Sequence, residues 1–218
     1  MAKRLWQPVV ENFADVQRLV HLAARMDTYD EDRIRGELLR DRRSYYEAEL
    51  TNQAARVGCP GRTGRLTNTE RLAILNDLSQ IDAISIVNTY NYDLAIAIQH
   101  IRSEVPTANR FTYAARLRDW QAKRAAWKDR QIQLYTENTA RSMAQQDFYL
   151  FNNNIGTAEL VPKTAVCPVC VGLVARGEVS IRVATNHPPP FHTSCPHLWS
   201  MNPGKVAPNE CINLWMGQ

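Results

Sequence analysis

Two pairs of metal-ligand residues near the C-terminus carry the clearest chemical signal in the sequence. Cys167 and Cys170 are separated by two residues, and His192 and Cys195 repeat this gap after 21 intervening residues. A pair with this gap can reach one ion from a single turn of the chain, and two pairs complete a tetrahedral Cys3His set. Thiolate and imidazole ligands favour zinc over hard cations. The sequence therefore predicts a zinc ion held by Cys167, Cys170, His192 and Cys195.

The predicted zinc is structural, because four protein ligands leave no coordination position for a reactive water. Few apolar residues lie between the two pairs, and small modules of this kind draw on the order of 10 kcal/mol of folding free energy from their metal. The fourth ligand is open on spacing alone. His187 and His197 both lie near enough in sequence to replace His192, and we keep His197 as the alternative ligand.

The other two cysteines are Cys59, which stands alone in a loop, and Cys211, a further candidate ligand that lies far along the tail from the two pairs. The chain has five cysteines and begins without an apolar signal segment. An odd number in that context argues against a disulfide framework and for a reducing compartment. We expect Cys211 to be a buried free thiol and Cys59 to be a small residue within a loop.

Motifs of common enzymes are missing from the sequence. It has no GxSxG, and its loop GCPGRTGR at 58–65 lacks the GK[ST] ending of a phosphate-binding loop. An HNH-type nuclease is the sharpest enzymatic alternative, since such folds combine zinc knuckles with histidines, and Asn186-His187 imitates the start of one. The prolines at 188–190 would break the strand that this site needs, so we expect no enzyme.

A basic stretch from Arg110 to Arg130 is the second chemical feature. Its seven basic and two acidic residues carry +5, more than the net charge of +4 of the whole chain. Such side chains release counterions when they bind phosphates, although a solvated helix face explains them equally well. Trp120 and Trp127 lie a heptad apart there, which favours core packing over base stacking. The candidate contacts to DNA or to an acidic partner are Arg116, Lys123, Arg124 and Lys128.

Long helices must position these features. Apolar residues at spacings of three and four predict helices over 8–55, 68–103 and 111–151. The glycine-rich loop at 57–68 separates the first two helices, Thr67 with Glu70 fits a capping box at the start of the second, and Pro106 ends it. No apolar run reaches the length of a membrane span. We predict a mostly α protein with long antiparallel helices, followed by a small α+β zinc-knuckle module.

The C-terminal part differs in composition from the helices. Residues 178–184 alternate polar and apolar side chains like a short strand, and three prolines then require an extended path. We divide the chain into an N-terminal helical region (1–106), a long basic helix (107–155) and a zinc-binding module with a C-terminal tail (156–218). Aromatic and apolar residues near the end are expected at an interface: Trp199, Leu214 and Trp215.

The C-terminal motifs resemble those of a known family. The segments CPVC, VGLVARGEV and HPPPFHTSCPHLW are similar to the C-terminal signature of phage Mu F-type minor head proteins, also called head morphogenesis proteins. That family has a CPxC knuckle, a short hairpin, a proline-rich approach and a second knuckle of HPxC type. The run YTENTARS at 135–142 resembles a polar run on its upstream helix, so the resemblance covers about residues 132–200.

Position by position, the resemblance implies the four ligands that spacing alone predicts. The sequence departs from the family at two places: Thr193 replaces the proline after the knuckle histidine, and His197 stands where the family often has cysteine. What the resemblance implies is a virion protein, because family members occur in few copies in the phage head at the portal vertex and act in head assembly, sometimes in DNA ejection.

We therefore expect a minor capsid protein at the portal or head-tail connector region, located in the virion head or neck and in the host cytoplasm during assembly. Its expected partners are the portal protein, the major capsid protein and packaged DNA, with no membrane, in multiple copies of a symmetric assembly. The competing interpretation is a zinc-containing nucleic-acid-binding protein.

Overall fold

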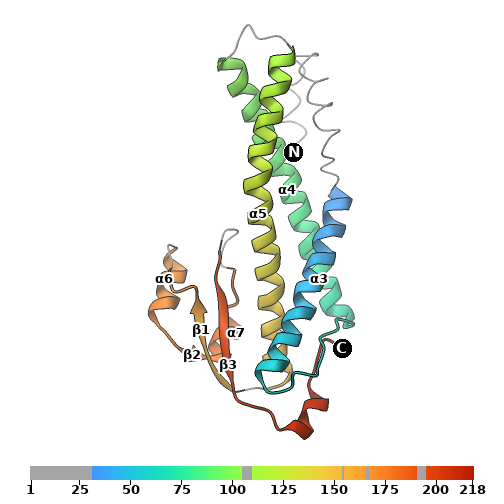
Figure 1. Ribbon diagram of the computed structural model, residues 1–218, viewed down its shortest axis with the longest axis vertical. Helices are drawn as coiled ribbons and strands as arrows, with labels where there is room; N and C mark the ends of the chain where they lie inside the picture. The colour runs from blue at the N-terminus through green and yellow to red at the C-terminus, as the bar shows by residue number, and fades with distance from the viewer. Residues whose placement is uncertain (1–30, 105–109, 154, 165–166, 191–194) are drawn as a thin grey trace. The chain divides into compact units, whose positions relative to one another are not determined.

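The computed structural model describes residues 31–104, 110–153, 155–164, 167–190 and 195–218 (Figure 1). Three long helices come first: α3 (Glu31–Arg56), α4 (Thr69–Glu104) and α5 (Arg110–Phe151). They are followed by β1 (Gly156–Val161), α6 (Pro168–Ala175), β2 (Val179–Ser180), α7 (Ile181–Asn186), β3 (Leu198–Pro203) and the 3-10 helix η1 (Pro208–Asn213). This confirms the predicted mostly α fold with a small C-terminal α+β module.

The long helices begin and end close to the predicted positions. The ranges 68–103 and 111–151 agree with α4 and α5 within one residue at each end, and the 8–55 range ends with α3, while its first part lies outside the described residues. The predicted capping residue is wrong. Asn68 caps α4 instead of Thr67, because its Oδ1 accepts the N–H of Arg71 at 3.1 Å, and asparagine is among the strongest N-cap residues.

The described residues form two compact units, and all three long helices contribute to both. The first unit contains residues 31–37 and 77–129, and the second contains 38–76 and 130–218. The limits at 106 and 155 that we assigned from the sequence stay a prediction. No helix among the described residues is long and apolar enough to cross a membrane.

The first unit has a small core between α4 and α5. Leu94, Ile98 and Ile101 of α4 are buried with Leu117 of α5, and Trp120 packs against this cluster. Trp120 thus serves core packing, as the heptad spacing indicates. The side chain of its predicted partner, Trp127, lies outside the described residues.

The core of the second unit combines the three long helices with the sheet. Tyr46 and Leu50 of α3, Phe148 of α5 and Trp199 of β3 are all at most 3% exposed. Here the start of α4 lies against the end of α5, since Arg71 forms an ion pair with Asp147. The sheet of the C-terminal module therefore rests on the same apolar core as the helices.

The sheet has three antiparallel strands in the order β2-β1-β3. Leu160 pairs with Trp199 and Ala158 pairs with Met201, and these four side chains are buried on one face, as the period of two requires. The predicted strand at 178–184 is wrong beyond Ser180. The Ser180 Oγ accepts the N–H of Val183 at 3.3 Å and caps α7 there, so the local capping bond overrides a short alternating pattern.

The C-terminal tail, residues 204–218, lies along the loop at 57–68. The carbonyl of Val57 accepts the N–H of Val206 at 2.8 Å, and the carbonyl of Gly217 accepts the N–H of Thr67 at 2.8 Å. Gly217 has φ +105°, and a Cβ there would lie 2.7 Å from the carbonyl oxygen of Arg65. A side chain at this position is excluded both by the left-handed backbone and by the close approach.

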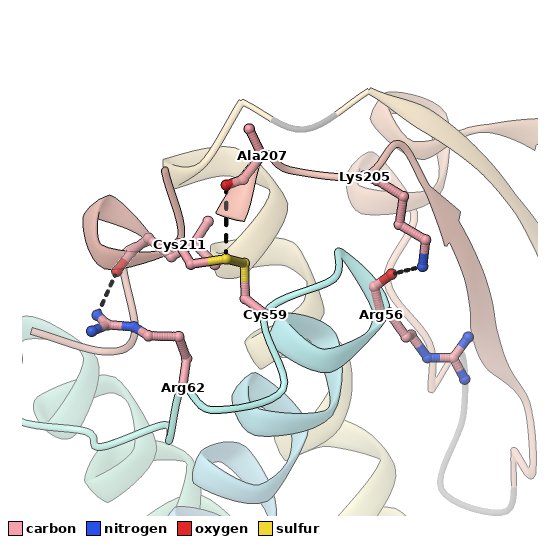
Figure 2. The surroundings of a disulfide bond; sticks show 7 residues. Arg56, Cys59, Arg62, Lys205, Ala207 and Cys211 are labelled. Atoms are coloured by element: carbon pink, nitrogen blue, oxygen red, sulfur yellow. Dashed lines mark hydrogen bonds between the residues drawn. A yellow bond between two sulfur atoms is a disulfide. The ribbon is translucent and has the colours of Figure 1, made fainter. Parts of the chain in front are cut away.

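A disulfide joins the tail to this loop (Figure 2). Cys59 and Cys211 are bonded, with their Cα atoms 5.6 Å apart and a sequence separation of 152. This corrects two expectations: Cys211 is not a free thiol, and Cys59 is not merely a small loop residue. The sequence gives no sign that the loop and the tail lie together. Trp199 and Leu214, expected at an interface, are buried in this chain's own core.

Candidate metal centre

Two cysteines and one histidine form a buried cluster in the C-terminal module. Cys170 comes from α6, and Cys195 and His197 come from the segment that leads into β3. Their ligand atoms all lie within 4.8 Å of one another, and each residue is at most 2% exposed. The three residues lie close enough to hold a metal ion.

The spacing of the ligand atoms matches a tetrahedral zinc site. With Zn–S near 2.3 Å and Zn–N near 2.05 Å, tetrahedral geometry places two sulfurs about 3.8 Å apart, and sulfur and nitrogen about 3.6 Å apart. The Cys170 and Cys195 Sγ atoms are 3.8 Å apart, and the Cys195 Sγ lies 3.6 Å from the His197 Nδ1. Both distances agree with one ion between the three side chains, and this soft donor set suits zinc.

The orientation of His197 is fixed by the backbone. Its Nε2 lies 3.0 Å from the carbonyl oxygen of Thr164. A carbonyl oxygen can only accept, so Nε2 carries the proton and the lone pair of the neutral ring is on Nδ1, which faces Cys195. Histidines that ligate metals usually have their second nitrogen held in this way. The ring is therefore prepared to donate Nδ1 to an ion.

Cys167 adds a third sulfur, and a candidate fourth ligand, next to this cluster. It precedes α6, and its Sγ accepts the N–H of Cys170 at 3.2 Å, which makes it the N-cap of the helix. The hydrogen bond with the Cys170 side chain lowers the pKa of the Cys167 thiol, whereas burial raises the pKa of the Cys170 thiol. The knuckle thus pairs a half-buried thiol whose pKa is lowered with a buried thiol whose pKa is raised.

Helix α5 holds the segment that carries the ligands. Asn138 donates its Nδ2 proton to the carbonyl of Cys195 at 2.9 Å. Gln145, two turns further along α5, donates to the carbonyl of Trp199 at 3.1 Å. The Trp199 indole in turn donates to the carbonyl of His187 at 2.9 Å. Two amides spaced seven residues apart on one helix therefore fix the backbone on which Cys195 and His197 stand.

Two of the four predicted ligands, Cys170 and Cys195, lie in this cluster together with the alternative ligand His197. Cys167 lies beside them. His192 lies outside the described residues. His187 is exposed, and its Nδ1 is 3.0 Å from the carbonyl of Val183, so it does not join the cluster. Spacing alone does not place His197 in the cluster, because its ring is held there by the Thr164 carbonyl, which is 33 residues away in sequence.

The four basic residues proposed to contact DNA are in different situations. Arg124 has a side chain only 8% exposed, with its Nε 2.9 Å from the Asp93 Oδ2, and its guanidinium lies over the Tyr90 ring at 5.0 Å. Lys123 is exposed and pairs with Asp119 at 2.8 Å. Arg116 is exposed, and the side chain of Lys128 lies outside the described residues. Arg124 is therefore part of the packing between α4 and α5.

Comparison with known proteins adds no relative. No protein-family model matches the chain, and no curated protein or solved structure matches it.

Proposed function

We propose that Cys167, Cys170, Cys195 and His197 hold one structural zinc ion, and that the protein is a non-enzymatic minor capsid or head morphogenesis protein of a phage. The observation that carries the first part is the buried cluster of Cys170, Cys195 and His197, with the imidazole oriented by Thr164. This choice replaces His192, the ligand favoured by the sequence, with the alternative His197.

Burial and ligand number support a structural role. Three of the four donors are at most 2% exposed, so a substrate has no approach from their side. A fourth donor at Cys167 would close the coordination sphere, as in Cys3His sites that stabilise folds. In this proposal the ion joins α6 to the segment before β3 and fixes the module that is built on α5.

The resemblance to phage Mu F-type minor head proteins supports the second part. The residues that carry it include both cysteine knuckles and the run at 135–142. Within that run, Asn138 is 4% exposed and donates to the carbonyl of Cys195. The polar run therefore supplies a side chain that holds the backbone of a proposed zinc ligand. This contact is a reason for the polar run and the cysteine knuckles to occur together.

In this function the protein would act as a rigid connector in the virion head or neck, assembled in the host cytoplasm. The portal protein, the major capsid protein and packaged DNA are its proposed partners, in several symmetric copies. Binding nucleic acid as the main activity is less well supported, because Arg124 is engaged with Asp93 and Lys123 with Asp119.

The zinc proposal is tested on the purified full chain by elemental analysis and native mass spectrometry. We expect one zinc per chain. His197→Ala should lower the zinc affinity by more than roughly tenfold, since even residues that only support ligands cost that much. His187→Ala is the matched control, because His187 lies in the same module outside the cluster, and it should bind zinc like the wild type. Unchanged affinity in His197→Ala would contradict this ligand set.

The virion proposal is tested on particles of the phage that encodes the chain. Quantitative mass spectrometry of purified heads should find the protein at a few copies per particle, and gentle disruption should release it with the portal. Its absence from both finished heads and assembly intermediates would refute the role in the virion, whatever the metal content of the isolated chain.

A further inference from the structure

The disulfide between Cys59 and Cys211 lies outside the metal cluster. It links the loop at 57–68 to the C-terminal tail. Cys59 follows α3 and is 2% exposed. Cys211 belongs to η1 in the tail and is half-buried. Their Cα separation of 5.6 Å falls in the ordinary range of disulfides, so the backbone already brings the two residues to bonding distance.

Hydrogen bonds on both sides of the disulfide hold the tail without it. Before Cys211, the N–H of Val206 donates to the carbonyl of Val57 at 2.8 Å, and the Lys205 Nζ donates to the carbonyl of Arg56 at 2.6 Å. After Cys211, the Arg62 guanidinium donates to the carbonyl of Leu214 at 3.2 Å. Figure 2 shows the Lys205 and Arg62 side chains reaching across on the two sides of the sulfur pair.

We propose that Cys59 and Cys211 form a redox latch that locks the docked tail onto the loop at 57–68. With both cysteines reduced, the hydrogen bonds keep the tail in place and hold the two thiols together. An oxidant then closes the latch with little movement of the backbone. The latch is open in a reducing compartment and closed in an oxidising one, such as the medium outside a cell.

The oxidant is a low-molecular-weight disulfide, for which oxidised glutathione is the probe. The Cys211 thiolate, the more accessible of the two, attacks one sulfur of oxidised glutathione, forms a mixed disulfide and releases one glutathione thiolate. The Cys59 thiolate then attacks the Cys211 sulfur, forms the protein disulfide and releases the second glutathione. Two protein thiols lose two electrons and two protons in total, and one oxidised glutathione becomes two reduced ones.

Closing the latch changes how the C-terminal module is attached. Its first strand, β1, follows α5 directly in sequence, so that end is covalently fixed. Its last strand, β3, continues into the tail, which only hydrogen bonds and packing hold until the latch closes. Oxidation therefore turns a module fixed at one end into a module fixed at both.

The test uses the zinc-loaded full chain in buffers of reduced or oxidised glutathione. Peptide mapping should find the Cys59–Cys211 linkage only in the oxidised buffer. The amides of Val206 and Thr67 form hydrogen bonds between the tail and the loop. Their hydrogen exchange should slow by roughly tenfold or more on oxidation, because a tail tethered by the disulfide redocks at high effective concentration. In the reduced buffer these amides should keep measurable protection.

Cys211→Ser and Cys59→Ser are the matched variants, since serine keeps the size of the side chain. Both should exchange like the reduced wild type in either buffer. Free Cys59 and Cys211 in the oxidised wild type, or a linkage of either to Cys167, Cys170 or Cys195, would overturn the proposal. So would equal exchange in the oxidised wild type and Cys211→Ser, or fully unprotected amides in the reduced protein. Zinc content, measured on the same samples, reports separately on the metal proposal.

Discussion

A buried hydrogen bond between α3 and α5 allows a pH-dependent test of the helical core. The Tyr46 hydroxyl donates to the Asp147 Oδ2 at 2.5 Å, and the Arg71 guanidinium approaches the other carboxyl oxygen at 2.9 Å. Tyr46 is fully buried and Asp147 is 3% exposed. Tyr46→Phe removes the hydroxyl, keeps the ring and leaves a buried carboxyl group with one donor fewer.

The size of the effect follows from the charge of the acceptor. A hydrogen bond to a charged group contributes about 1.5–3 kcal/mol, and a neutral one about 1 kcal/mol. We therefore expect Tyr46→Phe to lower the free energy of unfolding by about 2 kcal/mol at pH 7, for the Asp147 carboxylate that pairs with Arg71. At pH 4 the loss should approach about 1 kcal/mol, because protonation makes the acceptor neutral.

The direction of the pH dependence is set by the pKa of Asp147. Burial raises this pKa above its ordinary value of 3.8, while the Tyr46 hydrogen bond and Arg71 oppose the rise. Since the folded pKa exceeds the unfolded one, the stability linked to Asp147 protonation is complete below 3.8 and is lost as the pH rises through the folded pKa. Tyr46→Phe removes one opposing influence, so the folded pKa rises further and the penalty grows with pH.

Urea denaturation followed by circular dichroism at pH 4 and pH 7, with a chelator present at both, measures the two penalties. Tyr45→Phe is the control, because Tyr45 is the preceding residue and is only half-buried; it should change stability by less than about 0.5 kcal/mol. A Tyr46→Phe penalty below that of the control at pH 7, or one that is larger at pH 4 than at pH 7, would refute the reasoning.

Three further perturbations probe other parts of the second unit. Gly64→Ala should lower the free energy of unfolding, measured in denaturant, by about 1–3 kcal/mol, because the new Cβ would lie 2.6 Å from a side-chain atom of α3. Gly61→Ala in the same loop is the control and should be nearly neutral, because its Cβ would meet nothing within 4 Å. Asn138→Ala should weaken zinc binding about tenfold in a chelator competition, and Gln133→Ala, at an exposed position on the same helix, should leave it unchanged. Chelation should remove exchange protection from β1 while the long helices keep theirs; unchanged protection of β1 would contradict a structural role for the metal.

The sequence predicts those parts of the structure that are determined by interactions between residues close together in the chain. Helices α4 and α5 follow from apolar spacing over 36 and 42 residues, where each turn repeats the same signal. The strand at 178–184 rested on seven residues, and one serine was enough to start a helix within it. Short patterns are decided by single hydrogen bonds, which a pattern of polar and apolar residues does not record.

The candidate site shows the same division. The cysteine knuckles are local, so their spacing predicted Cys167, Cys170 and Cys195. The place of His197 in the cluster and the disulfide are not local: the first involves a contact with the carbonyl of Thr164, and the second involves a loop 152 positions away from Cys211. Such pairings need the tertiary structure, because no periodic signal connects their two ends.

The outer edge of β3 has a consequence for how copies of the protein can meet. β3 ends the sheet, yet its carbonyls at Trp199 and Met201 already accept hydrogen bonds from Gln145 and Arg56 of the helices. A strand whose acceptors are taken by side chains is a poor template for another strand. The β3 edge is therefore poorly suited to pairing with a strand of another copy of the chain.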